Sequence, residues 1–517
     1  MIDSINLKNY KAFESVTIPI KPLTILLGAN SVGKSSIIQM LMLLHQTAEE
    51  RFGMYSSALK IYGNYVNIGA FENLFRNLKT NDPLIIQIRF HNDAVLKKIR
   101  GFRNEMVDSL TNIVAFMPTS DLWKDAEKGL PDRKSVRDFV QKFWDLMRRI
   151  GENDNQILSF IKYRMDIPYM FEDDNIDNIL KCYDLREHIS NIEDTSLGVT
   201  YELVVEDARL KIKKFIVDIG NECKLLEIEN KTESNIKVSS FVSLDKQDRD
   251  YIESKVNFGN TIFGILSGEK EVKQTMVSDS LVQLASIILE NLQAELSENR
   301  VNYVSPLRAH PKRYYMLDKA KMTISLDTLD GDAIAEVLKE NGSIKRKVNG
   351  WFGKFGFKID VKPFKEVIHH MFVTQNGLPL DITDVGFGIS QVLPIIIQGF
   401  LSEKDSVTII EQPEIHLHPK MQADLGDLLI DVVNTDHKKL VVETHSEYIL
   451  RRIRRRMSEG KIKKEDVSIC LFHPKEKDCP AWVEILDIGE KGAFKWPEDY
   501  YDGELTLDVT EFLKNQN

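Results

Sequence analysis

GANSVGKSS, Gly28 to Ser36, is the stretch that decides the fold. It satisfies the pattern G-x-x-x-x-G-K-[S/T] in full, and it lies between a short apolar run (23–28) and a strong helical pattern (35–50). The backbone N–H groups of such a loop wrap phosphates, and the following helix N-terminus adds partial positive charge. A chance glycine-rich turn rarely has this setting. The stretch therefore predicts a nucleotide phosphate site on an α/β fold.

The side chains of this loop have separate expected roles. Lys34 has the length and charge to reach the β- and γ-phosphates, and the Ser35 hydroxyl is placed to bind Mg²⁺. ATP and Mg²⁺ are thus the expected cofactors. The predicted ATP-binding residues are Gly28, Asn30, Ser31, Gly33, Lys34, Ser35 and Ser36.

A second informative stretch is SVTIIEQPEIHLHP, residues 406–419. Its apolar strand ends in Glu411, and ligands of open α/β sheets bind at the carboxyl ends of strands. Glu411 is therefore predicted to hold Mg²⁺, directly or through water. The next residue is Gln412, whose amide cannot accept a proton at ordinary pH but can orient a water molecule. Glu414 and His445 are candidate substitutes for a general base, although the sequence does not show where Glu414 points.

Two more stretches suit the same site. TDVGFGISQVLPIII (383–397) places small residues before an apolar helix, which is either a plain helix cap or an anion-binding N-terminus. In VVETHSEYIL (441–450) a strand ends near His445, which is either structural or a γ-phosphate and water contact. With the other motifs present, the functional interpretation is favoured for both. The contacts predicted in the first stretch are Gly386, Gly388, Ser390 and Gln391.

The overall composition is that of an ordinary globular protein: 517 residues, 43% hydrophobic, 28% charged, with a net charge of −10. No apolar run approaches the ~20 residues that span a bilayer, and the N-terminus has no apolar signal-like region. The four cysteines show no metal or disulfide spacing, which is typical of reduced thiols. We therefore expect a cytoplasmic protein without a membrane partner. The negative net charge does not exclude a local basic groove for nucleic acid, because such binding depends on patches of charge.

The texture of the chain suggests three parts. Residues 1–92 show strand patterns and one helix, and residues 301–517 return to alternating strands and helices. Between them, 93–300 is dominated by charged helical patterns such as 135–150 and 278–298. The prediction is an α/β P-loop ATPase head with a mostly parallel sheet, split in sequence by a long, mainly helical insertion.

These motifs resemble the ABC-type ATPase heads of the RecF, SMC and OLD group. In that group a phosphate loop (28–36), a signature (386–391), a metal-side acid (411), a D-loop (416–419) and a switch histidine (445) occur in this order, commonly around a long insertion. Within the group, the signature, EQPEIHLHP, ETHSEY and a tail with WPEDYYDGEL (496–505) are similar to the stand-alone PtuA-type ATPases of Septu and retron-associated anti-phage modules. The likeness covers roughly residues 1–90 and 300–505.

The resemblance implies a nucleotide sandwich in which the signature of one subunit closes over the phosphate loop of another. With a single phosphate loop in the sequence, this requires a homodimer or higher homo-oligomer. Most relatives have a catalytic carboxylate where this chain has Gln412, so we expect slow hydrolysis. The resemblance also implies a separate HNH-type (PtuB-like) nuclease as partner, with a reverse transcriptase and its single-stranded DNA or RNA product if the module is a retron.

Two alternatives remain open at this point. One is a RecF-like DNA-repair ATPase that binds DNA directly, and the other is a nucleotide-sensing scaffold with negligible hydrolysis. The basic run 451–456 is either a solvated helix face or a nucleic-acid site, with the first favoured. OLD-type relatives carry a C-terminal nuclease domain, but only about 70 residues follow His445. The pair Asp330 and Asp332 is expected to be a turn and helix cap.

Overall fold

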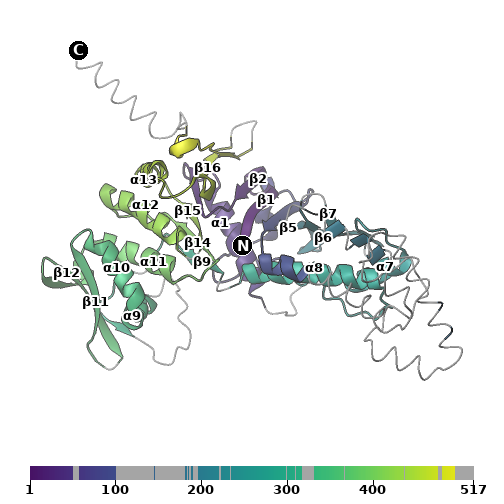
Figure 1. The fold of residues 1–517 in the computed structure, drawn as a ribbon, viewed down its shortest axis with the longest axis horizontal. Helices are drawn as coiled ribbons and strands as arrows, with labels where there is room; N and C mark the ends of the chain where they lie inside the picture. Colours follow the sequence, from purple (N-terminus) through teal and green to yellow (C-terminus); the bar gives the residue numbers. More distant parts are fainter. Residues whose placement is uncertain are drawn as a thin grey trace, which may run out of the picture. The chain divides into compact units, whose positions relative to one another are not determined.

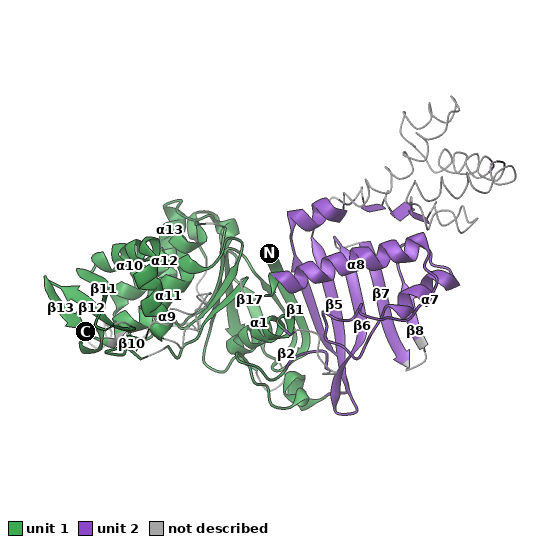
Figure 2. Cartoon of the chain, turned by 90° about the horizontal axis from the view of Figure 1, so that it is seen from below, with its two compact units in different colours: residues 1–49, 61–79, 295–517 green, residues 50–60, 80–294 purple. Residues whose placement is uncertain are grey.

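The structure, a computed structural model, divides into two compact units (Figure 2). Unit 1 comprises residues 1–49, 61–79 and 295–517, and unit 2 comprises 50–60 and 80–294. The predicted boundaries, 92/93 and 300/301, fall at different points. The structure describes residues 1–50, 57–99, 145, 149, 181–182, 184–185, 188–189, 192, 196–220, 223–232, 235–297, 300–308, 310–316, 331–365, 367–435, 437–475 and 480–494.

Unit 1 is built on a six-stranded sheet in the order β17-β16-β3-β15-β14-β9. All neighbours are parallel except β17, which pairs antiparallel with β16 at one edge. Every residue of β3 and β15 is buried, as expected for strands covered on both faces. The strands are β3 (Leu23–Gly28), β9 (Val301–Val304), β14 (Val407–Glu411), β15 (Lys439–Glu443), β16 (Val467–His473) and β17 (Trp482–Ile485).

Helices and smaller elements complete unit 1 around one hydrophobic core. Figure 1 shows α12 and α13 running side by side next to this sheet. The helices are α1 (Lys34–Ala48), α9 (Gly331–Glu340), α10 (Gly342–Gly353), α11 (Phe387–Leu401), α12 (Pro419–Val433) and α13 (Glu447–Ser458). Short 3₁₀ segments cover Phe71–Leu74, Arg76–Leu78, Ile382–Asp384, Lys464–Asp466 and Glu490–Gly492.

Two antiparallel elements belong to unit 1. The first is the hairpin of β1 (Ile2–Tyr10) and β2 (Phe13–Pro19). The second is a small sheet next to α9 and α10, in which β12 pairs with each of its three neighbours. Its strands are β10 (Tyr315–Met316), β11 (Phe357–Pro363), β12 (Ile368–Gln375) and β13 (Leu378–Asp381).

Unit 2 contains the antiparallel succession β4-β5-β6-β7-β8. Helix α8 (Met276–Glu295) runs across these strands in Figure 2, and α7 (Lys246–Ser254) begins at a capping box on Asp245. The strands are β4 (Leu84–Phe90), β5 (Leu197–Glu206), β6 (Arg209–Ile219), β7 (Cys223–Thr232) and β8 (Asn235–Ser239). The last four lie in the insertion predicted to be mainly helical, so its described part is a strand-and-helix mixture.

Several predicted features lie outside the described residues. They are most of the helix expected over 135–150, Asp330, and the tail segment 496–505. In the part of the chain that the structure describes, no helix is long and apolar enough to cross a membrane. Three of the four cysteines are described, and all three are free and buried: Cys182, Cys223 and Cys470.

Candidate nucleotide site

The phosphate loop connects β3 to α1, and two of its glycines are required by backbone geometry. Gly28 has φ 141°, and a Cβ there would lie 2.6 Å from the carbonyl oxygen of Phe472. Gly33 has φ 109°, and a Cβ there would lie 2.5 Å from the ring of Phe13 on the hairpin. Only glycine adopts these conformations without strain or collision. The loop conformation is therefore set by β16 and the β1–β2 hairpin as well as by its own sequence.

Lys34 is the buried cation of the loop, with 3% of its surface exposed. Its Nζ donates to the carbonyl oxygens of Gly28 at 3.0 Å and Ala29 at 2.7 Å. Glu443 Oε1 lies 3.8 Å from the same nitrogen. Burial lowers the pKa of Lys34, and the charge of Glu443 opposes that shift. The ammonium group thus curls onto the loop's own carbonyls, from which it can exchange to a phosphate oxygen.

Two glutamates meet at the carboxyl edge of the sheet. Glu411 ends β14 and Glu443 ends β15, and the two residues are register partners in the parallel pair. Tyr303 of β9 donates its hydroxyl to Glu411 Oε1 at 2.5 Å, and Ser35 donates its hydroxyl to Glu443 Oε2 at 3.3 Å. Glu443, which was not predicted from the sequence, thus lies between the predicted metal residues Ser35 and Glu411. The available signal was that both apolar runs, TIIE and VVE, end in glutamate.

Electrostatics make this carboxylate pair unusual. Burial and the nearby Glu411 charge raise the pKa of Glu443 to about 7. Burial also raises the pKa of Glu411, against the hydrogen bond from Tyr303 and the charge of Arg308. Two carboxylates that share a poorly solvated edge cannot both ionise freely. The two glutamates are therefore expected to share a proton or to bind a cation.

Gln412 occupies a constrained turn directly after Glu411. Its φ is 43°, in the left-handed region that few residues with side chains adopt. Its N–H donates to the carbonyl oxygen of Glu443 at 2.8 Å. Buried Arg308 donates Nη2 to the carbonyl oxygens of Glu411 at 2.7 Å and Gln412 at 3.1 Å. The two main-chain anchors fix where the Gln412 side chain begins.

Both carboxylate oxygens of Glu414 are engaged by the turn after β15. One of its carboxylate oxygens accepts a hydrogen bond from the Thr444 hydroxyl at 2.7 Å, and the other accepts one from the His445 N–H at 2.7 Å. Burial raises the pKa of Glu414, against these two hydrogen bonds. Glu414 therefore connects the turn after β14 to the turn after β15 by two hydrogen bonds. To act as a base it would first have to release these donors.

His445 has a buried ring nitrogen, Nε2, that has no hydrogen-bond partner among the described residues. Burial, and secondly the charge of Lys34, lowers the pKa of its imidazole. A neutral ring at physiological pH can accept or donate one hydrogen bond at Nε2. This state suits the predicted contact to a phosphate oxygen or a water.

The predicted signature forms the start of α11. Gly386 precedes the helix and is exposed, and a Cβ on Gly388 would lie 3.0 Å from the carbonyl oxygen of His416. Ser390 and Gln391, in contrast, are buried within this chain, at 7% and 6% exposed. The exposed part of the signature is therefore the glycine-containing end of the helix. The trans contact to ATP stays a prediction.

Four of the five arginines of α13 are paired with local acids. Arg452 contacts Asp424 and Asp427, and Arg456 contacts Asp427 and Glu459. The other contacts are Arg451 with Glu447, Arg455 with Glu459, and Arg454 with the ring of Phe494. This is the solvated, internally paired helix face favoured from the sequence. Asp332, the described member of the predicted cap pair, lies in the first turn of α9 and is paired with Lys312.

The donor set suits magnesium and does not form a complete protein cage. In the described ranges, no group of three or more His, Cys, Asp or Glu side chains could hold a metal ion. Mg²⁺ commonly takes one or two carboxylates and completes its shell with water and substrate phosphates. The hydroxyl of Ser35 with the carboxylates of Glu411 and Glu443 fits that pattern.

A phosphate loop between a buried parallel strand and a helix, facing acids at the carboxyl edge of the sheet, defines a P-loop ATPase. A family model described as "AAA ATPase domain" matches residues 1–450, and the chain belongs to this family. Among curated proteins, the OLD nuclease of Thermus scotoductus (strain ATCC 700910 / SA-01) is 27% identical over 134 residues. That match covers 24% of this chain and 25% of the nuclease, so it spans about a quarter of each.

Solved structures of SMC heads are also similar. One is an Smc head bound to the C-winged helix domain of ScpA, with a TM-score of 0.39, 10% identity, and coverage of 94% of this chain and 98% of that one. A second is the SMC head domain of Thermotoga maritima, with a TM-score of 0.33, 7% identity, and coverage of 94% and 99%. A third, an Smc head with an extended coiled coil bound to the C-terminal domain of ScpA from Pyrococcus furiosus, has a TM-score of 0.35, 10% identity and 99% coverage of both.

Proposed function

We propose that this ATPase is an ATP-gated switch that hydrolyses its nucleotide slowly and controls a separate effector. The observation that carries this proposal is an intact phosphate loop next to an acid, Glu411, that is followed by the amide Gln412. Loss of a general base lowers hydrolysis about 10²–10⁴-fold. Glu414 is not a ready replacement, because both of its oxygens are engaged by Thr444 and His445. The ATP-bound state is then long-lived.

The switch works through association of two or more copies. ATP bound at one phosphate loop leaves γ-phosphate charge that a second copy covers with the exposed start of its α11, next to Gly386. Nucleotide therefore favours the closed homodimer, or a higher homo-oligomer, by contacts that exist only in that state. Gln391 and Ser390 are buried in the single chain, so they shape this helix end and become contacts only if the helix shifts.

The effector is proposed to be another chain, an HNH-type nuclease of the PtuB kind in a bacterial anti-phage module. The motif likeness to PtuA-type ATPases supports this assignment. The OLD nuclease match includes only a quarter of that enzyme, and the described residues contain no group of three or more His, Cys, Asp or Glu side chains that could hold the metal ions of a nuclease. In a retron module, a reverse transcriptase and its single-stranded DNA or RNA product would supply the signal.

The experiment is co-purification of the full chain with the product of the neighbouring nuclease gene, with and without ATP. We expect a stable complex, DNA cleavage by the complex only, and a change in that cleavage on adding a non-hydrolysable ATP analogue. An absence of association together with indifference to ATP would rule out the proposal. A nucleotide-sensing scaffold would give the same association but no product in a single-turnover assay with Mg-ATP.

The RecF-like alternative has less support from the structure. Direct DNA binding needs free cationic side chains, and four of the five arginines of α13 are paired with acids on α12, on α13 or at its C-cap. DNA-stimulated hydrolysis by the isolated chain would favour this alternative.

A further inference from the structure

Glu443 lies where a second metal-side carboxylate would act. It ends β15 directly beside Glu411, and the parallel register sends both side chains to the same side of the same sheet edge. Both strands are held at their ends, because the Gln412 N–H donates to the main-chain oxygen of Glu443. The pair is therefore positioned by the sheet and does not depend on a mobile loop.

The surroundings of Glu443 face the phosphate loop. The Ser35 hydroxyl donates to Oε2 at 3.3 Å, and Lys34 Nζ lies 3.8 Å from Oε1. Ser35 is the loop residue whose hydroxyl binds the metal in P-loop proteins. Glu443 contacts it, whereas Glu411 has its hydrogen bond from Tyr303 on β9.

A purely structural role explains this arrangement poorly. Glu443 is buried and Glu411 is partly buried, and two adjacent carboxylates in this setting cannot both stay ionised at low cost unless a cation neutralises them. The nearest cation, Lys34, already donates to two carbonyl oxygens and is beyond hydrogen-bond distance from Glu443. Lys34 is also needed for the phosphates. A divalent ion would neutralise both carboxylates without competing for Lys34.

We propose that Glu443 is a second magnesium-side acid, which holds the ion of the bound nucleotide together with Ser35 and Glu411. This inference rests on the proposed ATP-binding function. In this site two carboxylates contact the ion, and Glu443 increases the affinity for it. The phosphates are bound by Lys34 and the backbone amides of the loop.

The test measures metal affinity apart from catalysis. The full chain is saturated with a non-hydrolysable ATP analogue, and the dissociation constant of Mn²⁺ from the complex is measured by electron paramagnetic resonance. Nucleotide affinity in EDTA is measured separately with a fluorescent analogue. We expect Glu443→Gln to weaken Mn²⁺ binding about tenfold or more, as loss of metal-site groups does. Its metal-free nucleotide affinity stays at the wild-type level or rises.

The controls separate the possible failures. Glu484→Gln, on partly exposed β17, is the matched control and should leave both constants unchanged. Glu411→Gln should weaken Mn²⁺ binding as well. Wild-type Mn²⁺ affinity in Glu443→Gln overturns the inference and leaves the proposed function standing. No nucleotide binding by the wild-type chain overturns the proposed function itself. If Glu443→Gln does not fold, Glu443→Ala removes the same carboxylate, and an unchanged Mn²⁺ constant in that variant overturns the inference.

Discussion

Glu411 and Glu443 are register partners at the ends of the parallel strands β14 and β15, and the phosphate-loop hydroxyl of Ser35 donates to the second of them. This relationship connects the two halves of the split head at the point where the nucleotide is expected. Strand β3, which leads into the loop, comes from the first segment of the chain, and both glutamates come from the last.

The pKa of Glu443 gives a first prediction. Burial and Glu411 raise this pKa from 4.5 to about 7. Between these values the unfolded chain loses a proton that the folded chain keeps. The stabilisation by the shift is thus fully present below pH 4.5 and is lost as pH rises to about 7, by about 3 kcal/mol at most. In EDTA, the melting temperature of wild type should fall relative to Glu443→Gln from pH 5 to 7.5. Parallel pH profiles of the two proteins would contradict this prediction.

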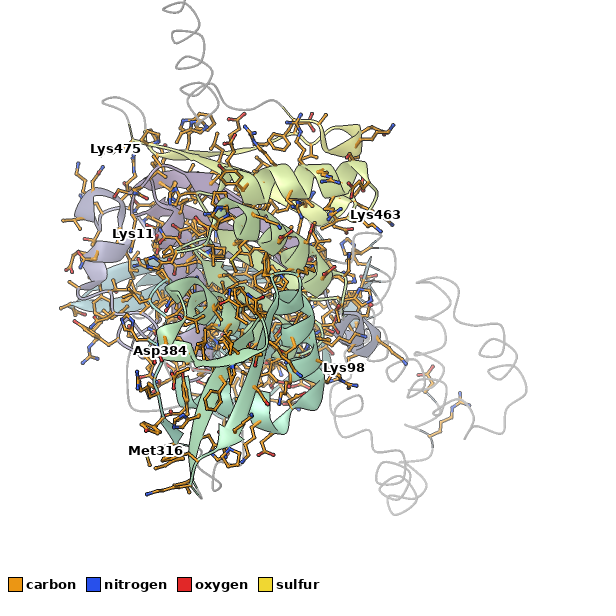
Figure 3. The ribbon with its side chains drawn as sticks, turned by 90° about the vertical axis from the view of Figure 1, so that its left-hand side faces the viewer. Lys11, Lys98, Met316, Asp384, Lys463 and Lys475 are labelled. Atoms are coloured by element: carbon orange, nitrogen blue, oxygen red, sulfur yellow. The ribbon has the colours of Figure 1, made fainter. Side chains whose placement is uncertain are left out.

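Lys34 should dominate nucleotide affinity. Its ammonium group already lies against the carbonyl oxygens of the loop, so it needs little reorganisation to contact phosphate. Lys34→Ala should weaken binding of a fluorescent ATP analogue about 10–100-fold, the range for a lost charge-assisted hydrogen bond. The control is Lys463→Ala, an exposed residue before β16 that is labelled in Figure 3. Equal losses in both variants would show that the assay reports net charge only.

Gln412→Glu should turn the slow ATPase into a faster one. The variant supplies a carboxylate of the same length at a turn whose backbone is held by Arg308 and Glu443. Single-turnover hydrolysis of Mg-ATP should rise about 10²-fold. Gln375→Glu, on β12, makes the same chemical change away from the site and should have no effect. An unaltered rate in Gln412→Glu with normal ATP binding would mean that the amide is not what limits hydrolysis.

Glu414 should contribute mainly to stability, through its hydrogen bonds to the turn after β15. Glu414→Ala leaves the Thr444 hydroxyl and the His445 N–H without their acceptors, and each buried orphan costs about 1–3 kcal/mol. We expect a lower melting temperature, with Glu403→Ala, an exposed residue, as the unaffected control. A double-mutant cycle with Thr444→Val should give a coupling energy of about 0.5 kcal/mol or more. Strict additivity would show that this hydrogen bond contributes nothing.

The arginines of α13 offer a test of nucleic-acid binding. Arg451 and Arg455 are exposed and paired within their own helix. Reversing both charges should leave the salt dependence of oligonucleotide binding unchanged, measured by fluorescence anisotropy at 50–200 mM salt. A slope lowered by about one per arginine would instead place phosphates on this face. Arg452→Ala should lower stability, because it removes the ion pair with Asp424 and leaves Asp427 paired with Arg456 alone.

Local sequence was sufficient for the phosphate loop and for the fold class. The GANSVGKSS pattern is contiguous, so the expected α/β P-loop ATPase head, split in sequence, is confirmed by the strand order and the family match. Glu443 was missed because its importance depends on which strands are neighbours. The contacts of Glu414 could not be predicted from the sequence for the same reason. A strand pattern does not show which residues the turn after the strand contacts. The roles of the site residues in catalysis and in trans contacts stay predictions.

Four strands of unit 2, β5 to β8, were missed for a different reason. In LKIKKFIVDI, lysines alternate with apolar residues, and the high charge resembles that of the helical patterns nearby. The burial of β6 nevertheless alternates for most of its length, as in a sheet with one solvated face. A count of period-two matches, instead of attention to charge, would have found these strands.

The position of β3 has a consequence for how the protein is made. Synthesis of this strand is complete once residue 28 has been added. Its hydrogen-bonded neighbours, β15 and β16, begin only at Lys439 and Val467. During synthesis the phosphate loop therefore has no parallel sheet to support it until the residues of β16, which end at His473, have left the ribosome. Products of translation that stops before this point would lack the nucleotide site, so ATP-dependent assembly would exclude them.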